Sequence, residues 1–419
     1  MKLGVYVGSI VKEQKVGGIF TFQDVIIRYI EKIQEANLEV IILYSSEKKI
    51  DLPVNCCSIN LTPFDSVGKR KKHFGEKLRG KIFKKCFSKI YAKYKDISKN
   101  LFFLNGPKYG RLHDIIEKEK IDMVYCAAHT SCKIDVPFIF TVWDLGHRVV
   151  PFFPEVSTKA RWEYREKIYS YMLPRASYII TGNAAGAKEI STAYGILPDR
   201  IKIIPFFTPE FALNAIPDNN KTITQKIDSL PYIFYPAQFW PHKNHIRLLQ
   251  ALNILHGEKY NQKLNVIFTG IDKGNLQYLG KVVTQLKLDD YVTIKGFVSQ
   301  EELVCLYRCA ETLVYVSYMG PNNLPPLEAM ALGCPVIASD IEGHRQQLGD
   351  AAWYIDPNSA EDIASKINEI VTKPQKRSDL IDRGGKLAQS LTPQKYVDEL
   401  AGVVNELKIK RECWDNSDF

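Results

Sequence analysis

"TLVYVSYMGPNNLPPLEAMALGCPVIAS", residues 312–339, contains the order of elements that decides the fold. The apolar run at its start predicts a buried strand, and PVIAS at its end predicts another. Between them, Asn323 can cap a helix whose first turn accepts Pro325 and Pro326. Gly333 suits the position just after that helix. We therefore expect a helix over Leu324–Leu332 between two buried parallel strands.

The same alternation of strand and helix continues outward on both sides of this stretch. A proline-bearing segment, residues 204–231, resembles a connection between two halves. The sequence thus predicts an α/β fold of two Rossmann-like domains, with parallel sheets facing across a cleft and ligands at the carboxyl ends of the strands. The expected divisions are an N-terminal domain (1–205), a linker (206–230), a C-terminal domain (231–395), and a terminal helix and tail (396–419) that could pack back on the first domain. The expected strands are 3–10, 38–46, 121–128, 136–143, 232–238, 265–270, 292–297, 312–317 and 335–339.

Length and composition fit a folded soluble protein. The 419 residues suffice for two domains of about 200 residues each. The apolar run Val136–Trp143 is far shorter than the roughly 20 residues that span a bilayer. The first residues, MKLGVYVGSIVKE, are expected to form a strand and not a signal peptide. The nine cysteines are scattered without zinc-site spacing, which favours reduced thiols in the cytosol.

A basic segment, Lys69–Lys95, has 12 Lys or Arg residues and one acid, Glu76. Apolar residues recur in it at roughly helical spacing, a pattern typical of helices that bind anionic membranes or nucleic acids. The alternative is a surface helix whose apolar side packs on the core. Both interpretations remain open at this stage.

Two loops after predicted strands carry residues suited to binding a nucleotide. Lys243 opens a helix after the strand that ends near Gln238, with Asn244 as the expected N-cap. Free N–H groups plus an ammonium form an anion site, although Lys243 could also be an exposed loop lysine. Glu328 lies near the start of its helix, and the alternative is that its carboxylate is simply stabilised there by the positive end of the helix dipole. Together, a cation for phosphate and a carboxylate for a ribose diol make a nucleotide site.

The C-terminal half resembles the retaining glycosyltransferases of family 4, within glycosyl transferases group 1, and in particular those that make bacterial surface polysaccharides. Four pieces carry the resemblance in the expected order: "YPAQFWPHKNH", "GFVSQEELVCLYRCAETLVYVS", "NNLPPLEAMALGCPVIASD" and the terminal helix. The first half is similar more loosely, through Gly17-Gly18, "VWDLGHRVVPFFPE" and "TGNAAGAKEI". The resemblance implies the GT-B fold, in which two Rossmann-like domains face each other across a cleft.

The resemblance also implies a set of donor-binding residues. Lys243 would contact the pyrophosphate and Glu328 the ribose hydroxyls. The loops at Gly270 and Phe297-Val298 would lie against the base, and Pro321–Leu324 would hold the departing phosphate. The complete expected set is Gly17, Gly18, Gln238, Lys243, Gly270, Phe297, Val298, Gly320, Pro321, Asn322, Asn323, Leu324 and Glu328.

Three positions depart from the family's pattern. Gly320 stands where the first glutamate of the E-x7-E motif is expected, so the contact to the transferred sugar would come from main-chain amides or Asn322. Gln238 replaces the usual arginine of the phosphate loop. The frequent His-Asp-Leu triplet reads Trp143-Asp144-Leu145.

The resemblance implies transfer of a hexose from a GDP- or UDP-linked donor to a hydroxyl of a glycan, with retention of configuration. The sequence has no D-x-D motif, so we expect no metal and no cofactor, with Lys243 and N–H groups neutralising the diphosphate. The catalytic candidates are Asp144, His147 and His129, in that order. The expected acceptor is a glycan on a polyprenyl lipid, in O-antigen, capsule or exopolysaccharide synthesis. The expected location is cytoplasmic, on the inner face of the membrane, through Lys69–Lys95.

Several alternatives remain from the sequence alone. The same architecture serves sugar-nucleotide epimerases and phosphorylases. A non-catalytic scaffold that binds nucleotide sugars is suggested by Gly320, where an acid is expected. Nucleic-acid binding is supported only by the basic segment and is not expected. The sequence does not indicate the oligomeric state.

Overall fold

A computed structural model describes residues 1–9, 18–30, 33, 38–46, 57–62, 110–130, 132–215 and 231–414. The basic segment Lys69–Lys95, Gly17 and most of the predicted linker lie outside these residues. Packing divides the chain into two units. The first unit is Met1–Thr141, Trp162–Ile180 and Leu400–Phe419, and the second is Val142–Arg161 and Thr181–Glu399. The domain boundaries expected at residues 205, 230 and 395 stay a prediction.

The first sheet is built on the apolar strand β1 (Lys2–Ser9), in which Leu3, Val5 and Val7 are completely buried. Its strand order is β3-β2-β1-β4-β5-β6-β7, and the pairs from β3 to β6 are parallel. The other strands are β2 (Glu39–Ser45), β3 (Cys57–Asn60), β4 (Met123–Cys126), β5 (Phe138–Thr141), β6 (Tyr178–Thr181) and β7 (Ile201–Ile203).

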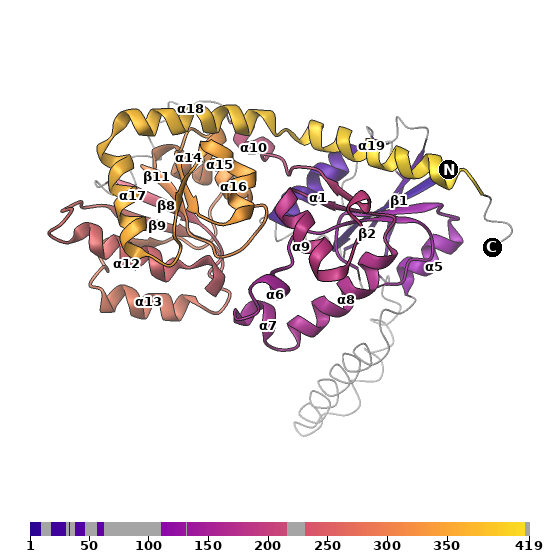
Figure 1. The fold of residues 1–419 in the computed structure, drawn as a ribbon, viewed down its shortest axis with the longest axis horizontal. Coiled ribbons are helices and arrows are strands. Elements are labelled where there is room, and N and C mark those ends of the chain that lie inside the picture. Colours follow the sequence, from indigo (N-terminus) through magenta and orange to yellow (C-terminus); the bar gives the residue numbers. More distant parts are fainter. Residues whose placement is uncertain are drawn as a thin grey trace, which may run out of the picture. The chain divides into compact units, whose positions relative to one another are not determined.

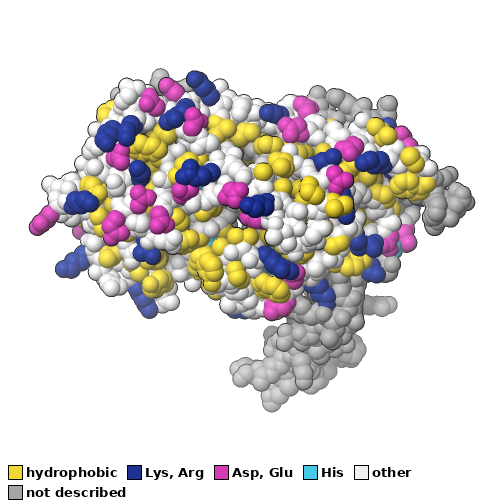
Figure 2. Space-filling view, viewed as in Figure 1, with side chains coloured by type: hydrophobic (Ala, Val, Ile, Leu, Met, Phe, Trp, Pro, Cys, Tyr) yellow, Lys and Arg dark blue, Asp and Glu magenta, His cyan; other side chains and the backbone are white. Residues whose placement is uncertain are grey.

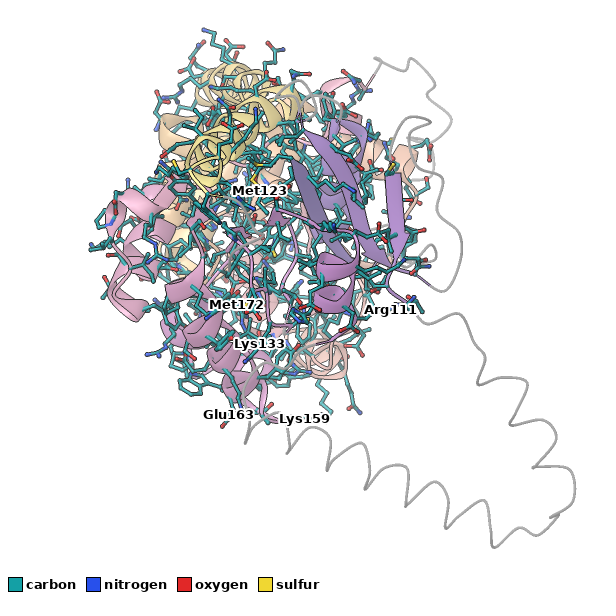
Figure 3. All side chains as sticks on the ribbon, turned by 90° about the vertical axis from the view of Figure 1, so that its right-hand side faces the viewer. Arg111, Met123, Lys133, Lys159, Glu163 and Met172 are labelled. Atoms are coloured by element: carbon teal, nitrogen blue, oxygen red, sulfur yellow. The ribbon has the colours of Figure 1, made fainter. Side chains whose placement is uncertain are left out.

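Helices follow these strands in the chain (Figure 1). Met123 of β4 and Met172 of α8 are both completely buried in the core of the first unit (Figure 3). The helices are α1 (Gly18–Arg28), α5 (Arg111–Lys118), α6 (Gly146–Val149), α7 (Pro154–Ser157), α8 (Arg161–Arg175), α9 (Ala184–Tyr194), the 3-10 turn η1 (Pro198–Arg200) and α10 (Glu210–Leu213).

The second sheet has the order β10-β9-β8-β11-β12-β13, and all of its pairs are parallel. Its strands are almost wholly apolar, as expected for strands buried on both faces. They are β8 (Tyr232–Pro236), β9 (Asn265–Thr269), β10 (Val292–Ile294), β11 (Thr312–Tyr315), β12 (Val336–Ser339) and β13 (Trp353–Ile355).

Helix α12 packs against α13 and α17 beside β8 and β9 (Figure 1). The core of this unit includes Phe234, Leu252, Phe268, Val314 and Ile367. The helices are η2 (Pro241–Lys243), α12 (His245–His256), α13 (Leu276–Gln285), α14 (Gln300–Cys309), α15 (Leu324–Ala331), α16 (Glu342–Leu348), η3 (Gly349–Ala351), α17 (Ala360–Thr372), α18 (Pro374–Ser390) and α19 (Pro393–Arg411).

The predicted α/β class with two parallel sheets is confirmed, and each expected strand has a counterpart. Strands β3, β6, β7 and β13 were missed, although β4, β5, β10, β11 and β12, which are equally short, were predicted. Lys and Arg side chains are interspersed with Asp and Glu on the face shown in Figure 2. Among the described residues, no helix combines the length and the apolar character needed to cross a membrane.

Candidate functional site

Lys243 lies in the loop that leaves the carboxyl end of β8. Its Nζ donates to the hydroxyl of Tyr315 at 2.7 Å and lies 3.5 Å from the Oγ of Ser317. Burial lowers the pKa of Lys243 to about 8, although the negative charges of Asp144 and Glu155 oppose that shift. Within the described residues, no carboxylate forms an ion pair with this ammonium. A partly buried cation bound only to hydroxyls is suited to an anionic ligand.

The predicted N-cap position of Asn244 is confirmed, but the capping hydrogen bond typical of asparagine is not made. Asn244 is the N-cap residue of α12, but it has a left-handed backbone (φ 58°) and its side chain caps nothing. Its Nδ2 instead donates to the carbonyl oxygens of Val316 and Pro357, at 3.2 Å and 2.8 Å. The first bond ties the Lys243 loop to the segment after β11, which is the neighbour of β8 in the sheet, and the second ties it to the segment after β13.

Glu328 lies deeper in its helix than the sequence suggested. Helix α15 begins at Leu324 with prolines in its first turn, and no acid lies in that turn. Its Oε2 accepts a hydrogen bond from the hydroxyl of Tyr307 at 2.7 Å. Burial raises the pKa of Glu328 to about 7, while the Tyr307 bond opposes the shift. Interaction with the helix dipole therefore does not explain this carboxylate, because it lies beyond the first turn and is costly to ionise.

At Gly320, the first residue of the loop Gly320–Asn323, the backbone has a conformation that only glycine adopts easily. Gly320 has φ 119°, and a Cβ there would lie 2.6 Å from Nδ2 of Asn323. At the position where the E-x7-E motif places its first acid, the backbone of this chain therefore disfavours any side chain. In the described structure, Nδ2 of Asn322 is buried without a hydrogen-bond partner. Leu324 is the first residue of α15, and because Pro325 and Pro326 have no N–H, its N–H is the only one among the first three residues of this helix.

Three residues that the sequence did not single out hold this loop. Asn183 caps α9 by accepting from the N–H of Gly186 at 2.9 Å, and its Nδ2 donates to the carbonyl of Pro321 at 2.5 Å. Gln347 of α16 bonds both the N–H and the C=O of Asn323, each at 2.9 Å. His344 Nε2 lies 3.0 Å from Nδ2 of Asn323. Asn183 falls within the quoted stretch TGNAAGAKEI, but a single sequence carries no signal for contacts so distant along the chain.

Four more of the expected donor residues, Gln238, Gly270, Phe297 and Val298, follow the ends of β8, β9 and β10. Gly270 has φ 151°, and a Cβ there would lie 2.3 Å from the carbonyl oxygen of Ala237. Glycine is therefore required where this loop packs on the Gln238 loop. Gln238 Oε1 accepts from the indole N–H of Trp240 at 3.0 Å. Phe297 is 62% exposed beside the partly buried Val298, so its ring is available for stacking. Gly18 begins α1 of the first unit.

The three catalytic candidates are divided between the units. Asp144 lies in the second unit, where its carboxylate accepts from the N–H of Gly146 at 2.7 Å and affects the pKa of Lys243. His147 is completely buried, with Nε2 3.2 Å from the hydroxyl of Tyr194, which supports a packing role. His129 belongs to the first unit and is bonded to the hydroxyl of Tyr169 at 2.9 Å. Their catalytic roles stay predictions.

A buried pair next to Lys243 was missed. His242 Nδ1 lies 2.5 Å from Oε1 of Glu155, which also accepts from the main-chain N–H of His242 at 2.8 Å. Burial lowers the pKa of His242 despite the nearby carboxylate. The pKa of Glu155 is also lowered: burial alone would raise it, but its bonds from His242 outweigh burial. The pair is thus a neutral imidazole and a carboxylate, with Nδ1–H donating.

In the described parts of the chain, no group of three or more His, Cys, Asp or Glu side chains is arranged to hold a metal ion. The second unit brings together Lys243, Glu328, the Gly320 loop and Asp144. Lys243 and Glu328 follow the adjacent parallel strands β8 and β11. This arrangement defines a parallel α/β protein with a polar site at the carboxyl edge of its second sheet.

Comparison with solved structures shows that the fold is GT-B. The chain is similar to the structure of HepE from Anabaena in complex with UDP, with a TM-score of 0.66 and 14% identity over 97% of this chain and 100% of that one. It is also similar to WaaG, a glycosyltransferase involved in lipopolysaccharide biosynthesis, with a TM-score of 0.64 and 14% identity, covering 96% and 99% of the two chains. At this identity the likeness establishes the fold alone.

Sequence comparison shows which protein family the second half of the chain matches. Residues 218–387 match the family profile of glycosyl transferases group 1, which confirms the resemblance for that part of the chain. The chain is 29% identical to O-antigen chain mannosyltransferase B of Escherichia coli over 51% of its length. It is 27% identical to O-antigen chain mannosyltransferase RfbU of Salmonella typhimurium over 59%. These alignments span 56% and 65% of the two relatives, less than two thirds of either. Assignment to family 4 stays a prediction.

Proposed function

We propose that this protein is a retaining glycosyltransferase that moves a hexose from a nucleoside-diphosphate donor to a hydroxyl of a bacterial surface polysaccharide. The observation that carries the proposal is the pairing of Lys243 and Glu328 after adjacent strands of one sheet. Sequence similarity to the two O-antigen mannosyltransferases favours mannose as the hexose. GDP is then the nucleoside diphosphate to test first, with UDP as the alternative.

The contacts available to each group support specific roles in donor binding. Lys243 has hydroxyl acceptors but no paired acid among the described residues, so its ammonium is available to the diphosphate. Glu328 uses Oε2 for Tyr307, and no described group donates to Oε1, which leaves that oxygen for a ribose hydroxyl. Phe297 and the Gly270 loop would lie against the base. The buried Nδ2 of Asn322 and the N–H of Leu324 would donate to the departing phosphate.

The chemistry follows from this donor site. As the bond between the anomeric carbon and the phosphate oxygen breaks, negative charge develops on the diphosphate, which Lys243 and the N–H groups stabilise. The acceptor hydroxyl attacks the same face of the sugar, and the leaving phosphate takes its proton. Asp144 is near enough to affect the pKa of Lys243, which supports a role beside the reacting sugar. No metal is required for this charge balance.

A thermal-shift screen tests nucleotide binding. GDP, UDP, ADP and CMP are added with their common sugars, and a ligand specific for the folded state raises the melting temperature. We expect one nucleoside diphosphate to give the largest shift and Glu328→Ala to reduce it. An unchanged shift in folded Glu328→Ala would overturn the ribose assignment.

The acceptor is proposed to be a glycan on a polyprenyl lipid at the inner face of the membrane. The support is the cationic segment Lys69–Lys95, in which each basic residue near an anionic leaflet contributes about 1 kcal/mol. Liposome flotation at low salt should show binding to anionic but not to neutral vesicles. Equal binding to both, or to neither, would exclude this role.

A second candidate is a nucleotide-sugar-binding scaffold without activity, favoured by one observation, the glycine at position 320. The two functions differ in turnover, because a scaffold binds the donor but releases no nucleoside diphosphate. Release above the rate of spontaneous hydrolysis, dependent on added acceptor extract, would reject the scaffold.

A further inference from the structure

A continuous chain of hydrogen bonds connects the last residue of β12, through His344 of α16, to the ammonium of Lys243. His344 Nδ1 lies 3.0 Å from the carbonyl oxygen of Ser339, and His344 Nε2 lies 3.0 Å from Nδ2 of Asn323. The hydroxyl of Tyr315 donates to Oδ1 of Asn323 at 2.7 Å. Lys243 Nζ then donates to that same hydroxyl oxygen at 2.7 Å. All of these groups belong to the second unit.

The chemistry of each group permits only one direction for the chain. A carbonyl oxygen can only accept, so His344 carries its proton on Nδ1 and leaves Nε2 as an acceptor. Asn323 must then present its amide nitrogen to the imidazole, an orientation that its bond to the carbonyl of Gly320, at 3.1 Å, independently requires. Its amide oxygen consequently faces Tyr315 and takes the phenolic proton. The oxygen of Tyr315 is left as an acceptor for the ammonium.

Burial keeps every member of the chain in the required state. His344 is completely buried, and burial lowers its pKa to about 4, so the ring is neutral. Tyr315 is 1% exposed, and burial raises its pKa far above the ordinary value, so the hydroxyl keeps its proton. Gln347 fixes the main chain of Asn323 from the same helix, α16. The chain therefore has few alternative arrangements.

We propose that His344 is a positioning residue, which acts through Asn323 and Tyr315 to hold the Lys243 ammonium toward an anionic ligand. The inference rests on the proposed function, since it takes a nucleoside diphosphate as that ligand. His344 also sets the rotamer of Asn323, whose main chain lies in the loop expected to bind the same phosphate. One imidazole thus orients both the cation and the loop on which the diphosphate would lie.

Two substitutions at one position separate positioning from packing. His344→Gln keeps an acceptor and a donor, since its amide oxygen can accept from Asn323 and its nitrogen can donate to Ser339. His344→Leu fills the space but supplies neither bond. Tyr315→Phe removes a single oxygen of the chain and serves when the leucine variant does not fold. Thermal melting identifies the folded variants.

The readouts are the acylation rate of Lys243, followed by mass spectrometry at pH 8, and calorimetric titration with GDP, UDP and inorganic pyrophosphate. Tyr315→Phe removes the acceptor of the ammonium, and His344→Leu removes the bond that holds Asn323 against the Tyr315 hydroxyl, so both variants should acylate faster than wild type. They should also bind the diphosphate about tenfold more weakly, while His344→Gln stays within about threefold of wild type. Lys263, on a different loop, serves as the reference for reagent activity.

Unchanged acylation of Lys243 in folded His344→Leu and Tyr315→Phe would overturn the inference. The inference would also be overturned if His344→Gln lost as much diphosphate affinity as His344→Leu. The shape of the side chain, and not its hydrogen bonds, would then account for the loss. If wild type binds none of the three anions, the proposed function fails. The acylation rates still decide whether His344 positions Lys243.

Discussion

At the scale of single residues, position 320 shows how the backbone constrains chemistry. The φ of 119° and the amide of Asn323 leave no room for a side chain there. Gly333 also has a positive φ (75°), but a Cβ at that position would have no neighbour within 4 Å. A side chain at position 333 would therefore meet backbone strain alone, whereas one at position 320 would meet both strain and steric conflict.

We expect Gly320→Ala to lower the free energy of unfolding by about 2–4 kcal/mol, from strain plus overpacking. Gly333→Ala should cost about 1–2 kcal/mol from strain alone. Chemical denaturation of both variants measures the difference. Equal losses would mean that the Asn323 side chain moves aside without cost, and an acid at position 320 would then be sterically acceptable.

Glu328 gives a prediction on pH. Its folded pKa of about 7 lies above the ordinary 4.5, so the folded state holds this proton more tightly than the unfolded state. The carboxylate thus destabilises the fold increasingly as the pH rises from about 4.5 to 7. Glu328→Gln should be more stable than wild type by on the order of 1–3 kcal/mol at pH 8, yet bind the nucleotide less well. A variant that is less stable than wild type at pH 8 would contradict this reasoning.

The Glu155–His242 pair makes the stability of the fold depend on pH in the opposite direction. Both groups have lowered pKa values, so the unfolded state takes up protons more readily than the folded state as the pH falls. Stability from the pair is complete above the ordinary pKa of His242, 6.5, and is lost as the pH falls below it. Melting temperatures of wild type should decline below pH 6.5. In Glu155→Gln the carboxylate no longer opposes the effect of burial on the pKa of His242, so this decline should be larger, with a lower melting temperature at pH 7.5; an identical pH profile would rule out the pair as its cause.

At the scale of elements, the N-cap of α9 has a second task. Asn183 caps its own helix and also holds the carbonyl of Pro321 in the loop before α15. Ser299 caps α14 in the usual way, accepting from the N–H of Glu302 at 3.2 Å, and among the described residues no hydrogen bond links its side chain to another loop.

We expect Asn183→Ala and Ser299→Ala each to lose about 0.5–2 kcal/mol of stability from the cap. Only Asn183→Ala should also weaken nucleotide binding, by about tenfold, because the Pro321 carbonyl loses its donor and the loop becomes less ordered. Calorimetric titration of the two variants compares them directly. Similar affinities would show that α9 does not position the loop.

The sequence predicted elements well where local chemistry specifies them. The proline pair and Gly333 correctly delimited α15, and continuous apolar runs located the long strands. Asn244 and Asn323 were correctly predicted as N-cap residues, but neither side chain makes a capping hydrogen bond. Both residues occupy the N-cap position, but tertiary partners take their amides, which no local pattern reveals.

At the scale of the whole molecule, the candidate site combines segments that lie far apart in the chain. Lys243 and Glu328 could be predicted because each follows a recognisable strand at the same edge of a sheet. The residues that hold the site in place could not be predicted from the sequence. Glu155, Asn183 and His344 bond partners that are 87, 138 and 21 residues away in the chain. The segment Val142–Arg161 precedes β6 in the chain yet packs in the second unit, which takes Asp144 and Glu155 with it.

The most direct test of the central claim is release of nucleoside diphosphate from nucleotide hexoses, GDP-mannose first, with an acceptor lipid extract. Turnover should depend on acceptor, and Lys243→Met should reduce kcat by at least about 100-fold, as expected for a group that stabilises transition-state charge. Lys263→Met, on another loop, should retain full turnover. Failure of wild type to release diphosphate from any donor, or undiminished turnover in Lys243→Met, would contradict the account.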